Sequence, residues 1–348
     1  MSYSKRSHDL MISATKERHG NRRENRIVDF LERRFAGKSA SIIKGIGDDA
    51  AVVRQQGAKE YWVLTTDMLL EDIDFREAWL TPDQLGHKSL AVNLSDLAAM
   101  GARPRFHAVS LGIPAYIADK WVVQFYQGLA RLAAAHKTLL IGGDLSRSAN
   151  GIQVTITALG ETWRRRAVYR SGGGAGDVLY VTGQLGKAAA GLELLKMGKT
   201  VGANASEKEA LRAHRTPRPQ CDVGMWLLQN RYASCMMDLS DGISTDLPRL
   251  CVSSNVGAEI YSDALPLFSA SKSWNSDPLK LALHGGEDFE LLFAVPGNAA
   301  TKFTRAYPKQ FPQVSRIGIL TSSKGIVLRE APGKPGHLLA NGGFDHFN

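Results

Sequence analysis

Acidic residues beside glycine, serine or threonine recur in five separate segments of the chain. These segments are residues 45–50 (GIGDDA), 65–67 (TTD), 93–96 (NLSD), 142–144 (GGD) and 238–242 (DLSDG). A single segment of this kind would be interpreted as a turn or a helix cap, because Asp, Asn, Ser and Gly are the common residues there. Five of them in one chain favour a shared chemical function.

Carboxylates gathered from five segments into one cleft would repel each other unless cations lay between them. Mg²⁺ prefers hard oxygen ligands and commonly joins a few protein carboxylates to the phosphates of a substrate. The pattern therefore predicts a magnesium-dependent site that uses a nucleotide for phosphoryl transfer. We expect Asp67, Asp96 and Asp241 to contribute most to catalysis.

Other nucleotide-binding and catalytic motifs fit the sequence less well. Residues 45–50 match the dinucleotide fingerprint G-x-G-x-x-A, but Asp48 and Asp49 stand where backbone amides should approach a phosphate. Residues 183–187 (GQLGK) contain the Gly-Lys pair of a P-loop, but Ala188 replaces its Ser or Thr and Val181 replaces its first glycine. Neither G-x-S-x-G nor H-E-x-x-H occurs, so we expect the chemistry to depend on aspartate, arginine, backbone amides and metal.

Regular elements are predicted between the acidic segments. Apolar residues at helical spacing predict a helix over 24–35, and residues 61–66 (YWVLTT) predict a buried strand that delivers Asp67 at its end. Thr81 as N-cap and Pro82 in the first turn predict the start of a helix that continues through Leu94. The next predicted elements are a strand over 106–112, a helix over 120–136 and strands over 139–141 and 152–159.

A change of composition near residue 165 divides the chain, because residues 163–166 (WRRR) and the glycine cluster at 172–176 predict a linker. Strands are predicted beyond it over 177–182, 234–237, 258–261, 289–295 and 326–328, with a helix over 187–197. The order lacks the strict alternation of a doubly wound fold. We therefore expect an α+β fold with an N-terminal domain at 26–165 and a C-terminal domain at 166–348 that completes the site.

The bulk properties are those of a soluble globular protein, with 44% hydrophobic and 22% charged residues among 348. No stretch has the length of a membrane span, and the N-terminus lacks the apolar centre of a signal peptide, so we expect a cytoplasmic protein with no membrane partner. Cys221, Cys235 and Cys251 lack zinc or disulfide spacing. Residues 1–25 are predicted to be a flexible basic extension and not a nucleic-acid-binding arm, because no aromatic residues accompany the charge in a stacking pattern.

Taken together, the motifs resemble those of the thiamine-monophosphate kinases, within the superfamily of aminoimidazole-ribonucleotide synthetase-like enzymes. The matching runs are GIGDDAAV (45–52), TTD (65–67), GHKSLAVNLSDLAAMGA (86–102), IGGD (141–144), MDLSDGISTDL (237–247) and GGEDFEL (285–291). They occur in matching order over residues 26–348. The resemblance implies two α/β-layered domains, a homodimer whose N-terminal sheets pair, and ATP-dependent phosphorylation of thiamine monophosphate to thiamine diphosphate.

The resemblance also implies roles for individual residues. The implied ligands of several Mg²⁺ ions are Asp49, Thr65, Thr66, Asp67, Asp96, Asp144, Asp238 and Asp241. The implied ATP contacts are Tyr126, Gly143, Asp144, Arg170 and Ser240, and the implied substrate contacts are Glu287 and Phe344. Asp67, Asp96, Arg170 and Asp241 are the expected catalytic residues. A phosphate acceptor is already deprotonated at neutral pH, so we expect direct in-line transfer without a general base.

One position departs from the family pattern, since Asp74 precedes Phe75 where the family typically has a histidine. An anionic residue there alters the expected contact with the substrate phosphate, and Arg76 is a candidate to compensate. The alternatives are another ATP-using synthetase of the same superfamily, or a catalytically weakened protein that binds nucleotide or thiamine phosphate. The intact acidic segments argue against the second alternative.

Overall fold

The computed structural model describes residues 23–35, 39–55, 57–163, 166–274 and 276–344. All but the last three residues of the predicted basic extension at 1–25 lie outside this part of the chain. The predicted boundary at residue 165 and the end of the C-terminal aromatic segment, residues 345–348, also lie outside it. Within the described residues, no helix combines the length and the apolar character needed to cross a membrane.

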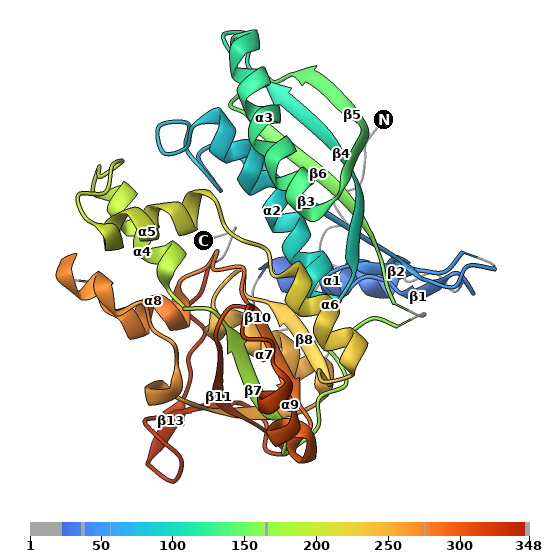
Figure 1. Ribbon diagram of the computed structural model, residues 1–348, viewed down its shortest axis with the longest axis vertical. Helices are drawn as coiled ribbons and strands as arrows, with labels where there is room; N and C mark the ends of the chain where they lie inside the picture. Colours follow the sequence, from blue (N-terminus) through green and yellow to red (C-terminus); the bar gives the residue numbers. More distant parts are fainter. Residues whose placement is uncertain (1–22, 36–38, 56, 164–165, 275, 345–348) are drawn as a thin grey trace, which may run out of the picture.

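Six strands of the described residues form the first sheet, in the order β1-β2-β3-β6-β4-β5. Their bounds are β1 Ile42–Lys44, β2 Ala51–Val53, β3 Trp62–Leu70, β4 Arg103–Ile113, β5 Leu139–Arg147 and β6 Gln153–Glu161. The pair β4–β5 is parallel and the other pairs are antiparallel. The helices α2 (Pro82–Ala99) and α3 (Asp119–His136) cover one face, and β5 forms an outer edge (Figure 1).

A second sheet follows in the chain, with seven described strands in the order β13-β12-β9-β11-β7-β10-β8. Their bounds are β7 Val178–Thr182, β8 Cys235–Asp238, β9 Gly257–Tyr261, β10 Leu291–Val295, β11 Val314–Thr321, β12 Ile326–Arg329 and β13 Gly336–Leu338. The helices around it are α4 Lys187–Lys196, α5 Ala205–Arg215, α6 Cys221–Asn230, α7 Ile243–Ser254, α8 Pro278–His284 and α9 Ala300–Ala306. Strands and helices of both halves mix without strict alternation, as predicted.

Helix α2 lies between the two halves, because it packs on β3 and β6 of the first sheet and on α6 and β8 of the second half. Its start is fixed by a capping box in which Thr81 and Gln84 each bond the other's backbone, with Pro82 in the first turn, so this part of the prediction is confirmed. At Gly86, a Cβ would lie 1.9 Å from the carbonyl oxygen of Phe125 on α3. Only glycine permits this approach, which locks α2 against α3.

The two strands that carry predicted site residues are longer than expected. Strand β3 continues past Asp67 to Leu70, so Asp67 lies inside the strand and not at its end. Strand β5 continues past Ile141 to Arg147, so Gly142 and Gly143 are extended and do not form a turn. In both cases the added residues pair with a neighbouring strand, β6 for β3 and β4 for β5, and this outweighs the local turn preference of Asp and Gly.

Candidate active site

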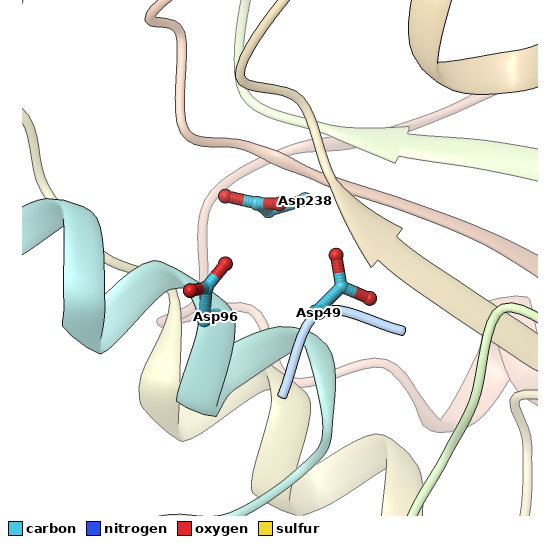
Figure 2. A group of neighbouring side chains, drawn as sticks. All are labelled: Asp49, Asp96 and Asp238. Atoms are coloured by element: carbon cyan, nitrogen blue, oxygen red, sulfur yellow. The ribbon is translucent and has the colours of Figure 1, made fainter. Parts of the chain in front are cut away.

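Three aspartates from separate elements converge where the two halves meet. Asp49 precedes β2, Asp96 lies on α2 and Asp238 ends β8, and one carboxylate oxygen of each lies within 4.8 Å of the others (Figure 2). Asp49 and Asp238 are buried. The structure thus joins three of the five acidic segments at one point.

The acidity of these carboxyl groups reflects their crowding. Burial raises the pKa of Asp96 well above its usual range, and the charges of Asp67, Asp238 and Asp49 raise it further. Burial and then Asp49 likewise raise the pKa of Asp238, and burial raises the pKa of Asp67 to about 6. Two unit charges about 4 Å apart repel by about 4 kcal/mol at an effective dielectric of 20. A cation placed between these carboxylates would relieve their mutual repulsion.

Hydrogen bonds orient these carboxylates without satisfying them. Thr65 donates to Asp96, and Ser95 Oγ donates to Asp238 Oδ2 over 2.6 Å. Among the described residues, Asp49 Oδ2 and Asp67 Oδ2 are buried and accept no hydrogen bond. Buried polar atoms are nearly always paired, so unpaired carboxylate oxygens beside the cluster fit a site for a hard divalent cation such as Mg²⁺.

Arg170 is the basic residue that reaches the cluster directly. Its Nη2 atom lies 2.7 Å from Asp49 Oδ1, and its backbone N–H donates to Asp48 Oδ1 over 3.1 Å. Lys44 binds the other oxygen of Asp48 at 3.2 Å. Burial opposes the charge on Arg170, but Asp49, Asp48 and Asp238 together outweigh burial and raise the pKa, so the guanidinium stays protonated. The sequence prediction placed Arg170 at this site without its two aspartate partners.

A cavity of about 540 Å³ surrounds the cluster and is strongly acidic. Nine carboxylic residues and two arginines line it within the described chain. Asp241 lines this cavity too, but its Oδ2 atom is bound by Arg249 Nη1 at 2.5 Å, and Arg249 also binds Asp246 at 3.1 Å. Asp241 is therefore near the predicted metal site while already paired with a cation of the chain.

A second cavity of about 520 Å³ adjoins the first and has a different lining. Phe75, Trp79, Leu192, Leu281 and His284 contribute ring or apolar surface to it. The two cavities share four lining residues, which are Asp74, Ser240, Glu287 and Phe344. We call the first the acidic cavity and the second the aromatic cavity.

The three residues predicted to contact substrate all lie at this junction. Asp74 Oδ2 accepts a hydrogen bond of 2.8 Å from the backbone N–H of Leu70, so its carboxylate closes the turn that follows β3. Phe344 is 44% exposed, and its backbone N–H donates to Asp241. Glu287 contacts Lys88 and His214, which together outweigh burial and hold its pKa at about 2.

The GGEDFEL run divides its three acids among three tasks. Glu287 faces both cavities, whereas Asp288 accepts from the backbone N–H groups of Gly186 and Ala188 at the start of α4. Glu290 accepts from Thr182 Oγ1 over 2.5 Å. Asp288, and not Glu287, is thus the acid that binds the free backbone N–H groups at a helix start.

Three predicted nucleotide contacts do not line either cavity. Asp144 and Gly143 lie on β5, and their register through β4 and β6 to β3 places them three strands from Asp67, about 14 Å at the usual strand spacing. Tyr126 lies on α3, edge-on to Phe125. Gly143 has φ +150°, and a Cβ there would lie 1.8 Å from the carbonyl oxygen of Val109, so both backbone conformation and packing require glycine here.

Strand alternation separates the two predicted threonine ligands. Thr65 and Asp67 share one face of β3, and Thr66 lies on the other, where its hydroxyl lies 3.2 Å from Thr157 Oγ1 on β6. Thr66 nevertheless lines the acidic cavity, as do Leu64 and Met68 of the same strand face.

Two buried residues that contact Glu287 were missed from sequence, namely Lys88 and His214. A lysine usually indicates an exposed helix face. The signal that could have found Lys88 is its setting, because small residues such as Gly86, Ser89 and Ala91 surround it and predict a helix packed on all sides.

With this geometry in place, comparisons with known proteins agree on a family. The model of the AIR synthase related protein N-terminal domain matches residues 47–162, and that of the C-terminal domain matches residues 174–330. Thiamine-monophosphate kinase of Bacillus subtilis is 33% identical over 313 residues, covering 88% of this chain and 94% of that protein. The corresponding protein of Synechococcus elongatus is 36% identical over 307 residues, covering 86% and 91%.

Among solved structures, AaThiL complexed with AMPPCP and TMP superposes with a TM-score of 0.80 at 31% identity, covering 93% of this chain and 97% of that one. The fold and the joined acidic segments thus define a two-domain protein of the AIR synthase related class, and the predicted fold class is confirmed. Within that class, the chain belongs to the thiamine-monophosphate kinase family and is an enzyme.

Proposed function

We propose that this chain transfers the γ-phosphoryl group of ATP to the phosphate of thiamine monophosphate, giving thiamine diphosphate and ADP, with Mg²⁺ required. The observation that supports this most is the pair of cavities that meet at Asp74, Ser240, Glu287 and Phe344. A transferase for two substrates needs two adjoining sites, one able to hold a polyphosphate with its metal and the other a ring system. AaThiL, to which this chain is similar, was solved in complex with AMPPCP and TMP, which supports the choice of two substrates.

The acidic cavity is the proposed site of ATP and Mg²⁺. Asp49, Asp67, Asp96 and Asp238 would hold the metal. Oxygens of Asp49, Asp96 and Asp238 converge, and Asp49 Oδ2 and Asp67 Oδ2 are buried without a hydrogen-bond donor among the described residues. Bound there, Mg²⁺ supplies the positive charge that lets donor and acceptor phosphates approach each other. Asp241 is a weaker candidate as ligand, since Arg249 already occupies one of its oxygens.

The chain's own contribution to transfer is positioning. Asp49 holds the Arg170 guanidinium beside the cluster, where it can bind a phosphate oxygen and stabilise charge as the bond to the leaving group breaks. The acceptor phosphate is ionised at neutral pH, so no residue has to remove a proton from it. Direct in-line transfer is therefore the proposed mechanism.

The aromatic cavity is the proposed acceptor site. Trp79 and Phe75 offer ring surface, and Glu287 offers a negative charge at the end nearest the acidic cavity. Asp74 is bound by the backbone of Leu70, which gives it a structural task in this chain and favours an active enzyme over a weakened binding protein.

We also propose that two copies of the chain pair through their N-terminal sheets. Every residue of β5 is exposed, including the apolar Leu139, Leu140, Ile141 and Leu145. A free edge strand with apolar side chains is a template for pairing. In such a dimer, Tyr126, Gly143 and Asp144 would serve the nucleotide of the other copy, which accounts for their distance from Asp67.

The test is to incubate the purified protein with ATP, Mg²⁺ and thiamine monophosphate and to separate the products by chromatography. Equal amounts of thiamine diphosphate and ADP are expected, and a chelator should abolish both. If the protein binds ATP but forms neither product, the proposal is refuted. The result would then favour another ATP-using reaction of the same superfamily with a different acceptor.

A further inference from the structure

A charged cluster distinct from the aspartates lies under the aromatic cavity. Lys88 on α2 places Nζ 2.6 Å from Glu287 Oε1, and His214 on α5 places Nδ1 2.9 Å from Glu287 Oε2. Each oxygen of one carboxylate is thus held by a different side chain. The three residues come from three separate parts of the chain.

Exposure falls from one side of the cluster to the other. The Glu287 side chain is 27% exposed, whereas those of His214 and Lys88 are 2% and 0% exposed. Lysine is almost never fully buried unless it is paired, because an isolated ammonium loses its hydration. Lys88 lines neither cavity, so its charge can act on a bound molecule only through Glu287.

The backbone at Glu287 is also held in an uncommon conformation. Its φ is +69°, in the left-handed region that non-glycine residues rarely adopt. The backbone N–H donates to the carbonyl oxygen of Ser240 over 2.8 Å. Such strain persists where the surroundings fix it, and it clusters at functional sites. Backbone and side chain are both restrained at the residue that joins the two cavities.

Helix α2 links this cluster to the metal-facing carboxylates. Lys88 and Asp96 are eight residues apart, so they share a helix face and lie about 12 Å apart along the axis. Val92, between them on that face, lines the acidic cavity. One rigid helix therefore fixes the separation between the support of Glu287 and the metal-facing Asp96.

We propose that Lys88 and His214 are positioning residues that hold the Glu287 carboxylate in one place and orientation, where it receives the cationic ring of the acceptor. This inference rests on the proposed function, because thiamine monophosphate carries a permanently charged thiazolium ring. The low pKa of Glu287, about 2, keeps the carboxylate ionised. Burial and then the charge of Lys88 lower the pKa of His214, so the imidazole is neutral where its Nδ1 lies 2.9 Å from the carboxylate.

The experiment is a double-mutant cycle of wild type, Lys88→Met, Glu287→Gln and the combined variant. The KM values for thiamine monophosphate and ATP are measured together with the affinity for thiamine monophosphate alone by calorimetry. Each single variant is expected to weaken acceptor binding about tenfold or more while the KM for ATP changes less than about threefold. The combined variant should bind the acceptor within about twofold of Glu287→Gln, because Lys88 acts through Glu287.

Two controls separate positioning from general destabilisation. Leu90→Ala removes a fully buried side chain from the same helix and should lower the melting temperature without changing acceptor affinity. Lys88→Arg should restore part of the affinity lost in Lys88→Met. If Lys88→Met does not fold, the combined variant, which leaves no unpaired charge, is compared with Glu287→Gln alone.

The outcomes are distinct. Losses that multiply in the combined variant, or equal weakening of ATP and acceptor, would overturn the positioning role. If the wild type binds thiamine monophosphate but shows no turnover, the proposed reaction is overturned. The binding affinities of the double-mutant cycle then test the role of Lys88 by themselves. Wild type that neither turns over nor binds thiamine monophosphate would overturn both.

Discussion

The two adjoining cavities treat their carboxylates in opposite ways. In the acidic cavity, burial and mutual repulsion raise the pKa values of Asp67, Asp96 and Asp238. In the aromatic cavity, Lys88 and His214 outweigh burial and lower the pKa of Glu287 to about 2. Arg170 pairs with one carboxylate of the first arrangement, which we propose also takes up Mg²⁺, whereas Lys88 balances the carboxylate of the second from within the chain. We infer that the acidic cavity binds cations that can exchange with solvent. The aromatic cavity instead presents a carboxylate that the chain holds in one position for the acceptor.

The largest expected effect comes from neutralising one carboxylate of the acidic cavity. Asp67→Asn should lower kcat/KM about 10³-fold, in the range found when one preorganised electrostatic group is removed. The melting temperature should stay the same or rise, because a buried and poorly paired charge is lost. Asp222→Asn, an exposed aspartate on α6, is the matched control. Wild-type turnover in folded Asp67→Asn would remove Asp67 from the metal site.

The activity of the acidic cavity is also predicted to depend on a second copy of the chain. Asp67→Asn and Asp144→Asn are each expected to be inactive alone. If Asp144 serves the other copy, a mixed dimer contains one site in which both aspartates are intact. Random exchange of subunits should then restore about a quarter of wild-type activity in a symmetric dimer. No recovery after verified exchange would place Asp144 outside the site or in the same copy as Asp67.

Magnesium should distinguish the two cavities in the absence of substrate. At a concentration one hundred times its Kd, a ligand that binds only the folded state stabilises it by about 2.7 kcal/mol, which raises the melting temperature by a few degrees. We expect this rise in wild type and in Glu287→Gln, and we expect it to be lost in Asp238→Asn. Differential scanning calorimetry with Mg²⁺ and with K⁺ at matched ionic strength measures it. An equal rise in all three proteins would place the bound ion elsewhere.

The smallest predicted effect concerns a buried acid outside both cavities. Burial raises the pKa of Glu290 to about 7, and Asp288 adds to the rise. A carboxyl with a raised folded-state pKa stabilises the fold below its unfolded pKa of about 4.5, and this stability is lost as pH rises through 7. Glu290→Gln should therefore be more stable than wild type at pH 8, by on the order of 2 kcal/mol, and not at pH 5. Denaturant titrations at both pH values test this, and parallel curves for the two proteins would contradict it.

The parts of the fold that local rules determine could be predicted from sequence. The Thr81 cap, the helix it starts and the amphipathic α1 (Arg23–Phe35) follow from residue type and spacing within one element. The extra length of β3 and β5 could not be predicted, because it depends on pairing with β6 and β4, which lie far away in the sequence. Local sequence signals indicated that the strands end near Asp67 and Gly142. Hydrogen bonds to strands distant in the sequence extend both strands beyond these residues.

The site shows the same division. The motifs identified the aspartates, and the structure brings Asp49, Asp96 and Asp238 together. The motifs did not show that Asp241 pairs with Arg249, because this pairing depends on tertiary contacts. They also did not show that the Thr66 side chain lies on the opposite face of β3 from Asp67, because this depends on the position of each residue in the strand. Lys88 and His214 were missed because burial of a charged residue is a property of its neighbours and not of its type.

The locked position of α2 has a consequence for how the sequence can change. Its first turn is fixed by the Thr81 cap and its side by the contact of Gly86 with α3. Deleting or inserting one residue between Lys88 and Asp96 would rotate one end by about 100° relative to the other, and no side-chain replacement could restore both. Residue types in this stretch can vary, but its length cannot, so alignments of active relatives should contain no gap there.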